Sequence, residues 1–238
     1  IDRAKDIKLR KFEELLKNQF TEEKIFNEIL PLFKSHGDNK DKIWMTVYHD
    51  AEIHTIFEYI IAITWCYITN DNSNIFYANL SLDVDMLPKS HAVGGNADYV
   101  RNYGDHTLLI EPTLTKDDTQ RQNEAESVPR HLGNAIFDKN EDQRRLSYAI
   151  FVAPYLDMNM LVSIRNWKFK AWLKEKDKKK IRLLLNILPL DIDDIINIHK
   201  SKIDYKTFHS KFIKILNDSE EDGYEWYESS VRRLINNL

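Results

Sequence analysis

The sequence predicts an α/β fold in which a mixed β-sheet is flanked by helices, and three observations support this prediction. Short apolar segments that resemble strands are interleaved with longer segments whose apolar residues recur at helical spacing. The segments 146–153 and 181–188 are almost continuously apolar, which is typical of buried strands. The chain of 238 residues is long enough for one well-packed domain and a smaller appendage.

The N-terminal region is predicted to be helical. Its first 34 residues are charged, with apolar positions at helical spacing that indicate two helices. The polar segment 35–42 predicts a loop and a boundary. We therefore expect a helical linker or prop over residues 1–40 and the main domain over 41–238. Asp50 is the expected N-cap of a helix that runs to about Tyr67.

The central region predicts a β-hairpin, with strands at 97–103 and 106–113 and a two-residue turn at Gly104-Asp105. After it, the pattern alternates again between strands and helices. Strands are expected at 146–153 and 181–188, and helices at about 119–127, 158–176, 191–199, 205–216 and 224–238.

Composition narrows the class of protein. The formal net charge of −4 argues against a protein that coats nucleic acid through positive charge alone. Cys66 is the only cysteine, which excludes an internal disulfide and a Cys-rich zinc site and favours a reducing cytoplasm. No apolar run reaches the roughly 18 residues that span a bilayer, because Glu58 interrupts the longest one, so no membrane association is expected.

The hairpin brings two acids together. If Gly104-Asp105 is the turn, Tyr103 pairs with His106 and Asp98 lies directly opposite Glu111. Side chains in such a pair lie on one face of the sheet with Cβ atoms about 4.5–5.5 Å apart. Two carboxylates there repel each other unless a hard cation such as Mg²⁺ lies between them. The alternative is a pair of solvent-facing acids on an exposed hairpin.

Two further acids are candidates for the same site. Glu124 and Gln120 share one face of the predicted polar helix, which follows the Glu111 strand and could fold back over the hairpin. Glu58 lies on a mostly apolar helix, where a carboxylate needs compensation from a metal-bound water or an arginine. The alternatives are an ordinary charged helix surface for Glu124 and a helix edge that reaches solvent for Glu58.

Basic residues offer contacts for phosphate. Arg130 and His131 follow the polar helix and could contact a scissile phosphate, or they could be a helix-end pair favoured by the dipole. The segment 167–180 alternates aromatic and basic residues, and a solvated helix face is preferred there over a DNA-tracking surface. The sequence contains no Walker loop, nucleophile elbow or HExxH motif.

These ordered features resemble the cleavage domain of the AlwI-like type IIS restriction endonucleases, a group that includes strand-nicking relatives of the BstNBI kind. The resemblance is best from about residue 57 to 153. The segments that carry it are GGNADYV and LLIEPTLTKDDTQRQNEAESVPRH. The matching positions are Glu58, Asp98, Glu111, Thr113, Gln120, Glu124 and the run 126–131.

The resemblance implies the core of the PD-(D/E)xK nucleases and Mg²⁺-dependent hydrolysis of DNA in a prokaryotic cytoplasm, with Mn²⁺ expected to substitute. Asp98 and Glu111 would be metal ligands, and Glu58 and Glu124 supporting acids. Full-length relatives carry a recognition region to which nothing here corresponds. We therefore expect double-stranded DNA as substrate and a recognition domain or partner subunit outside this chain. Cutting both strands would need a transient dimer or that partner.

One departure from the wider superfamily is Thr113, which stands where a lysine is usual. Either Lys116 reaches in, or the metal alone activates water. The neutral threonine also leaves open a catalytically silent subunit that acts as a binding or assembly module. A third alternative keeps the chemistry but acts on RNA or branched DNA, since phosphate contacts do not read the base.

Overall fold

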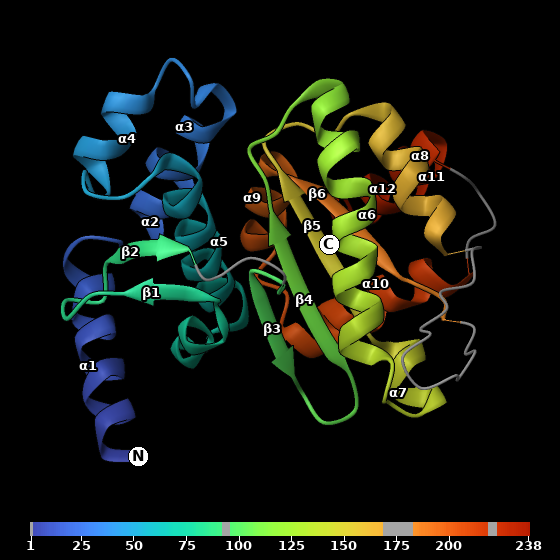
Figure 1. Cartoon of the computed structure of the whole chain (residues 1–238), viewed down its shortest axis with the longest axis horizontal. Coiled ribbons are helices and arrows are strands. Elements are labelled where there is room, and N and C mark those ends of the chain that lie inside the picture. Colours follow the sequence, from blue (N-terminus) through green and yellow to red (C-terminus); the bar gives the residue numbers. More distant parts are fainter. Residues whose placement is uncertain (1, 92–95, 169–182, 219–222) are drawn as a thin grey trace. The chain divides into compact units, whose positions relative to one another are not determined.

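The structure is a computed structural model that describes residues 2–91, 96–168, 183–218 and 223–238 (Figure 1). The chain forms two compact units, Ile1–Gly94 and Gly95–Leu238, which are described separately. The division predicted at residue 40 falls inside the first unit, because the segment after it packs with the N-terminal helices. The assignment of residues 1–40 as a linker stays a prediction.

The first unit is built around the helix α5 (Ile53–Thr69), whose residues are mostly buried. Its N-cap is Glu52 rather than the predicted Asp50, and the helix ends at Asn70 in the left-handed conformation. The remaining elements are α1 (Asp2–Asn18), α2 (Glu22–Lys24), the π-helix η1 (Ile25–Ile29), α3 (Leu30–Leu32), the 3₁₀ helices η2 (Phe33–Ser35) and η3 (Asn72–Tyr77), α4 (Lys40–Thr46), and the antiparallel pair β1 (Leu80–Leu82) and β2 (Pro88–His91).

The second unit contains a four-stranded mixed sheet, as predicted. Its strands are β3 (Tyr99–Asn102), β4 (Thr107–Pro112), β5 (Tyr148–Ala153) and β6 (Ile187–Asp191), in that spatial order. The β3–β4 pair is antiparallel, whereas β4–β5 and β5–β6 are parallel. Parallel neighbours place the C-terminal ends of β4, β5 and β6 at one edge of the sheet.

The hairpin has the predicted register. The Tyr103 N–H donates to the His106 carbonyl at 2.9 Å, and Gly104 has φ of 94°, a conformation that favours glycine. Tyr99 lies opposite Ile110, and one step further along the same register places Asp98 opposite Glu111. The register of the hairpin is therefore the one that the two-residue turn predicts, and the pairing of Asp98 with Glu111 extends it by one residue beyond β3 and stays a prediction.

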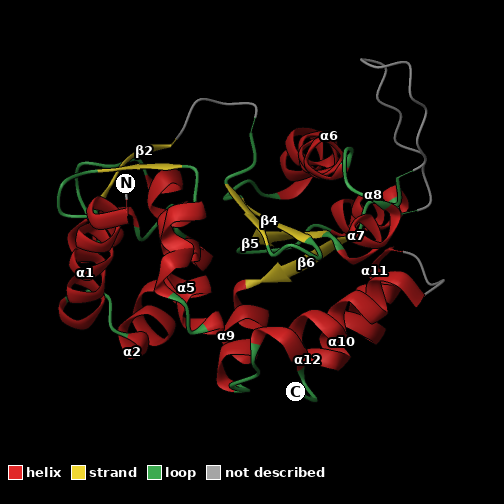
Figure 2. Ribbon diagram, turned by 90° about the horizontal axis from the view of Figure 1, so that it is seen from below, coloured by secondary structure: helices red, strands yellow, loops and turns green. Residues whose placement is uncertain are grey.

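Helices cover both faces of the sheet (Figure 2). One face carries α6 (Asp117–Ile136) and α8 (Met158–Trp167), and the other carries α9 (Ile192–Lys200), α10 (Tyr205–Asp218) and α12 (Arg233–Ile235). The remaining helices are α7 (Glu141–Leu146), α11 (Gly223–Trp226) and the π-helix η4 (Tyr227–Arg232).

The main core lies between the sheet and the α6–α8 layer. It is built of fully or almost fully buried apolar side chains, which include Leu109, Ala149 and Phe151 from the strands and Leu132 and Met160 from the helices. Burying one such large side chain stabilises the fold by about 1.5–3 kcal/mol. Glu111 has the same parity along β4 as Leu109, so it projects toward the layer that contains α6.

Two element boundaries differ from the predictions. Helix α6 continues through Pro129 to Ile136, because burial of Val128, Leu132 and Ile136 offsets the hydrogen bond that proline removes. The strand predicted at 181–188 begins only at Ile187.

In the region before β6, Leu183 and Leu185 are buried without belonging to a strand, so their apolar character reflects packing alone. The helix predicted over 158–176 is observed to Trp167, and its remainder lies outside the described residues, as does most of the basic–aromatic segment 167–180. Among the helices that the structure describes, none combines the length and apolar character needed to cross a bilayer.

Candidate active site

Three acidic side chains share one electrostatic environment at the C-terminal end of β4. Asp98 directly precedes β3, Glu111 lies near the end of β4 with 6% exposure, and Glu124 lies on α6. Burial of Asp98, followed by the negative charges of Glu111 and Glu124, raises the pKa of Asp98 to about 8. The hairpin acids and the helix acid, which are distant in sequence, are thus brought together.

Glu124 is held in place by hydroxyl groups. Thr113 Oγ1 donates to Glu124 Oε1 at 2.9 Å, and Ser127 Oγ donates to Glu124 Oε2 at 3.0 Å. The Thr113 hydroxyl also lies 2.8 Å from Thr115 Oγ1 and accepts the Thr115 N–H. Thr113 is therefore a neutral group that orients a carboxylate.

His131 binds Glu111 rather than standing free on the surface. Its Nδ1 lies 2.9 Å from Glu111 Oε1, and its side chain is only 11% exposed. Burial, then the charge of Arg130, lowers the pKa of His131, which favours the neutral ring, and the Glu111 carboxylate can only accept in this contact. The structure thus joins His131 to the acidic site through Glu111, and the phosphate contact predicted for His131 stays a prediction.

Gln120 connects three segments of backbone. Its Nε2 donates to the carbonyls of Thr115 at 3.0 Å and Tyr155 at 2.9 Å, while its Oε1 accepts the Asp157 N–H at 3.0 Å. The side chain is fully buried. These contacts fix the start of α6, and a catalytic role of Gln120 stays a prediction.

Two predicted residues are not brought into this cluster by described contacts. Arg130 is partly exposed, and its Nε lies 3.1 Å from Glu126 Oε2, one helical turn earlier. Its role in binding DNA phosphate stays a prediction. Glu58 is half-buried on α5, in the first unit. Its role as a supporting acid also stays a prediction.

The donor set suits a hard cation. Among the residues that the structure describes, no three His, Cys, Asp or Glu side chains are arranged so that they could already hold a metal ion. Mg²⁺ is commonly bound by only one or two carboxylates and completes its shell with water and substrate oxygens. Asp98 and Glu111 supply two such carboxylates, and binding of an ion would release the proton that the raised pKa leaves on Asp98 near neutral pH.

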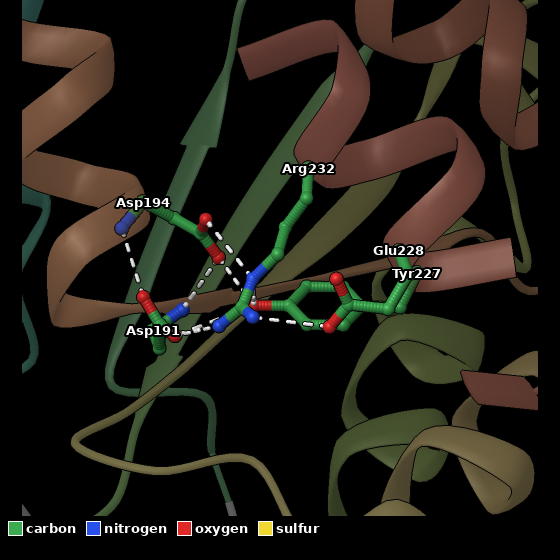
Figure 3. Close-up of polar contacts among 5 residues, drawn as sticks. All are labelled: Asp191, Asp194, Tyr227, Glu228 and Arg232. Atoms are coloured by element: carbon green, nitrogen blue, oxygen red, sulfur yellow. Dashed lines mark hydrogen bonds and ion pairs between the residues drawn. The ribbon is translucent and has the colours of Figure 1, made fainter. Parts of the chain in front are cut away.

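A second acidic cluster lies at the C-terminal end of β6 (Figure 3). Asp191 and Asp194 form a reciprocal capping box at the start of α9. Arg232 forms an ion pair with Asp191 and bonds Glu228 at 3.0 Å, and the Tyr227 hydroxyl donates to Asp194. Burial and the charge of Asp191 raise the pKa of Asp194 to about 6.

The second cluster was not among the sites predicted from the sequence. The signal available was the run of aspartates directly after an apolar segment, which is a capping pattern. Its arginine and tyrosine come from η4, more than thirty positions later, and no local pattern predicts that contact.

Comparisons with known proteins agree with the fold. The model of the family described as AlwI restriction endonuclease matches residues 1–198. The chain is also similar to the crystal structure of the small subunit, R.BspD6I2, of the heterodimeric restriction endonuclease R.BspD6I. That match has a TM-score of 0.59 and 19% identity, and it covers 89% of this chain and 98% of that one.

At this level of identity the structural match supports the fold, a mixed sheet flanked by helices as in a restriction endonuclease subunit. No curated protein matches the chain. The family match extends over most of the sequence, including all the acids of the β4 cluster. The chain belongs to the AlwI restriction endonuclease family.

Proposed function

We propose that this chain is a metal-dependent DNA endonuclease that hydrolyses phosphodiester bonds in double-stranded DNA and cuts one strand per active site. The observation that carries the proposal is the convergence of Asp98, Glu111 and Glu124 in a member of a restriction endonuclease family. Such a cluster of mutually repelling acids is costly to the fold, and a nuclease reaction gives it a use.

Asp98 and Glu111 are the proposed ligands of Mg²⁺, for which Mn²⁺ would substitute. When bound, the ion supplies positive charge to the scissile phosphate and lowers the pKa of a bound water. His131 holds Glu111 through the 2.9 Å Nδ1 contact, so it positions a ligand rather than contacting DNA. The facing carboxylates lie on a hairpin whose backbone is fixed by pairing with the rest of the sheet.

Glu124 is proposed to orient the attacking water and to accept its proton. Thr113 and Ser127 each donate to one oxygen of the Glu124 carboxylate, which limits its rotation. These donors leave the remaining lone pairs of both oxygens able to accept a proton from water. Gln120 contributes indirectly, because it fixes the start of the helix that carries Glu124.

The chain is proposed to act with a recognition region or a partner subunit. The similar structure is that of the small subunit of a heterodimeric restriction endonuclease, and this chain covers it almost completely. A single active site of the kind proposed here cuts one strand. Nicking would therefore be the expected product of this chain alone, and cleavage of both strands would require a second active site.

A plasmid assay tests the proposal. We expect the chain at high concentration to convert supercoiled plasmid to nicked circles with Mg²⁺ and not with EDTA, and the Glu111→Gln variant to lose this activity. Glu141→Gln is the matched control, because Glu141 is an exposed acid on α7 of the same unit. Equal cleavage by Glu111→Gln and the wild type would exclude the proposed site.

The second candidate is a catalytically silent subunit that serves as a binding or assembly module. Thr113 favours it, since its hydroxyl cannot supply the positive charge of the usual lysine. No metal-dependent cleavage of plasmid, RNA or branched DNA, combined with tight association to a companion chain, would support this candidate. Cleavage of RNA or branched DNA alone would keep the chemistry and change the substrate.

A further inference from the structure

We propose that Lys116 and Tyr155 form a binding site for the sugar-phosphate backbone of DNA beside the scissile bond. The proposal rests on the proposed function, because it names a substrate contact for the same site. Lys116 supplies the charge that binds a phosphate, and the ring of Tyr155 packs against the neighbouring sugar. We call these two residues the Lys116–Tyr155 pair.

The pair combines a cation with an exposed aromatic ring. Lys116 Nζ lies 5.6 Å from the centre of the Tyr155 ring, and Tyr155 is 52% exposed. Within the part of the chain that the structure describes, Lys116 has no ion pair with a carboxylate. A lysine whose charge is not neutralised inside the protein, on a flexible stem, is suited to bind phosphate as a point charge.

Gln120 fixes both members of the pair through their backbone. Its Nε2 donates to the carbonyl of Thr115, which precedes Lys116, and also to the carbonyl of Tyr155 itself. A fully buried amide thus holds the two residues side by side. Binding a ligand to both residues therefore costs less conformational entropy than ordering two independent loops would.

The pair lies at the same edge of the sheet as the acidic cluster. Tyr155 follows the end of β5 by two residues, and Lys116 follows Thr113 by three. The Thr113 N–H donates to the Val152 carbonyl at 2.8 Å, which joins the two segments there. Neighbouring protein strands lie about 4.8 Å apart, and successive phosphates of one DNA strand are about 3.4 Å apart along the helix axis. The pair can therefore contact a phosphate next to the one that the acidic cluster contacts.

The position of Lys116 bears on whether it acts in the chemical step or binds the flanking DNA backbone. One alternative from the sequence is that Lys116 reaches into the site in place of the superfamily lysine. In the structure its ammonium group lies over the Tyr155 ring instead. A residue that binds flanking backbone contributes to DNA affinity, whereas a replacement for the catalytic lysine contributes to the rate of the chemical step.

Binding of a labelled random-sequence duplex in EDTA, where no cleavage occurs, tests the pair directly. We expect Lys116→Gln to weaken binding roughly fivefold and to reduce the slope of log K against log salt by about 1. Tyr155→Leu should weaken binding with an unchanged slope, because it removes no charge. Lys139→Gln is the matched control, since Lys139 lies beyond the opposite end of α6.

Single-turnover cleavage in Mg²⁺ with saturating DNA completes the test. We expect Lys116→Gln to keep a rate within about threefold of the wild type. An unchanged salt slope, a wild-type chain that binds no duplex, or a rate loss of 100-fold with unchanged affinity would each overturn the inference. Absence of cleavage by the wild type, with the predicted binding intact, would instead defeat the proposed nuclease function alone.

Discussion

The two acidic clusters of the second unit occupy equivalent places, the C-terminal ends of the parallel strands β4 and β6, yet their chemistry differs. The β6 cluster includes Arg232 and the Tyr227 hydroxyl, which compensate the charges of Asp191 and Asp194 (Figure 3). The β4 cluster gathers acids with hydroxyls and a neutral histidine. Only the β6 cluster resembles a contact that stabilises the fold.

The difference shows how to separate a structural acid from a functional one. Removing one partner of an acid–arginine pair destabilises the fold when the acid is buried, because it leaves an uncompensated charge. Burial and neighbouring acids raise the pKa of Asp98 to about 8, above the value of about 6 for Asp194 beside Arg232, and acids held at that cost suit another purpose, of which binding a cation from solution is the simplest. The comparison therefore makes opposite predictions for the two clusters.

The largest expected effect is on cleavage. Asp98→Ala or Glu111→Ala should reduce the rate of DNA cleavage at least about 10³-fold, because each removes a proposed metal ligand, while circular dichroism shows an intact fold. Asp191→Asn is the comparison variant. It should retain the wild-type rate at temperatures where it remains folded, and a rate loss as large as that of Glu111→Ala would erase the distinction between the clusters.

The next effect is on stability. Arg232→Met should lower the free energy of unfolding by about 1–3 kcal/mol, below the usual cost of breaking a buried pair because the arginine is 38% exposed. Urea denaturation monitored by tryptophan fluorescence would measure it. Arg121→Met, on the exposed surface of α6, should change stability little. Equal effects of the two substitutions would show that the β6 cluster is not structural.

A smaller effect concerns the residue that holds a ligand. His131→Ala should weaken Mg²⁺ or Mn²⁺ binding by about 10–100-fold, because it removes the hydrogen bond that orients Glu111. Titration calorimetry on the full chain would measure the affinity. His49→Gln, an exposed histidine of the first unit, is the control. Unchanged affinity in His131→Ala would assign the contact a role in packing only.

The smallest effect depends on pH. The pKa of Asp98 is about 8 in the metal-free fold and near 3.8 when the chain is unfolded, so the folded state retains the proton to a higher pH. Its contribution to stability is present below pH 4 and is lost as pH rises through 8. Asp98→Asn should therefore stabilise the metal-free chain at pH 9 by at least about 1 kcal/mol. Destabilisation at that pH would contradict the repulsion on which the site depends.

The sequence predicts the fold where local patterns are sufficient. The two-residue turn at Gly104 determines the register of the hairpin, and so the pairing of Asp98 with Glu111, because side chains alternate strictly along strands. The family resemblance agrees with those positions. In this region the local turn and the family resemblance predict the same structure.

Other features depend on contacts between distant segments and could not be predicted. The apolar run at 181–188 combines irregular core residues with the beginning of β6, and periodicity does not separate the two. Gln120 is a polar residue on a polar helix in the sequence, but its amide is satisfied by backbone 35 and 37 positions away. Nothing local distinguishes it from its exposed neighbours.

The position of the two facing acids in the sheet gives them unequal freedom. Glu111 lies on β4, which is hydrogen-bonded to β3 on one side and to β5 on the other, so its backbone is fixed. Asp98 precedes β3, an edge strand with one neighbour in the described sheet. If the proposed ion binds between them, an ion of larger radius would be accommodated by displacement of Asp98, while Glu111 would keep its position.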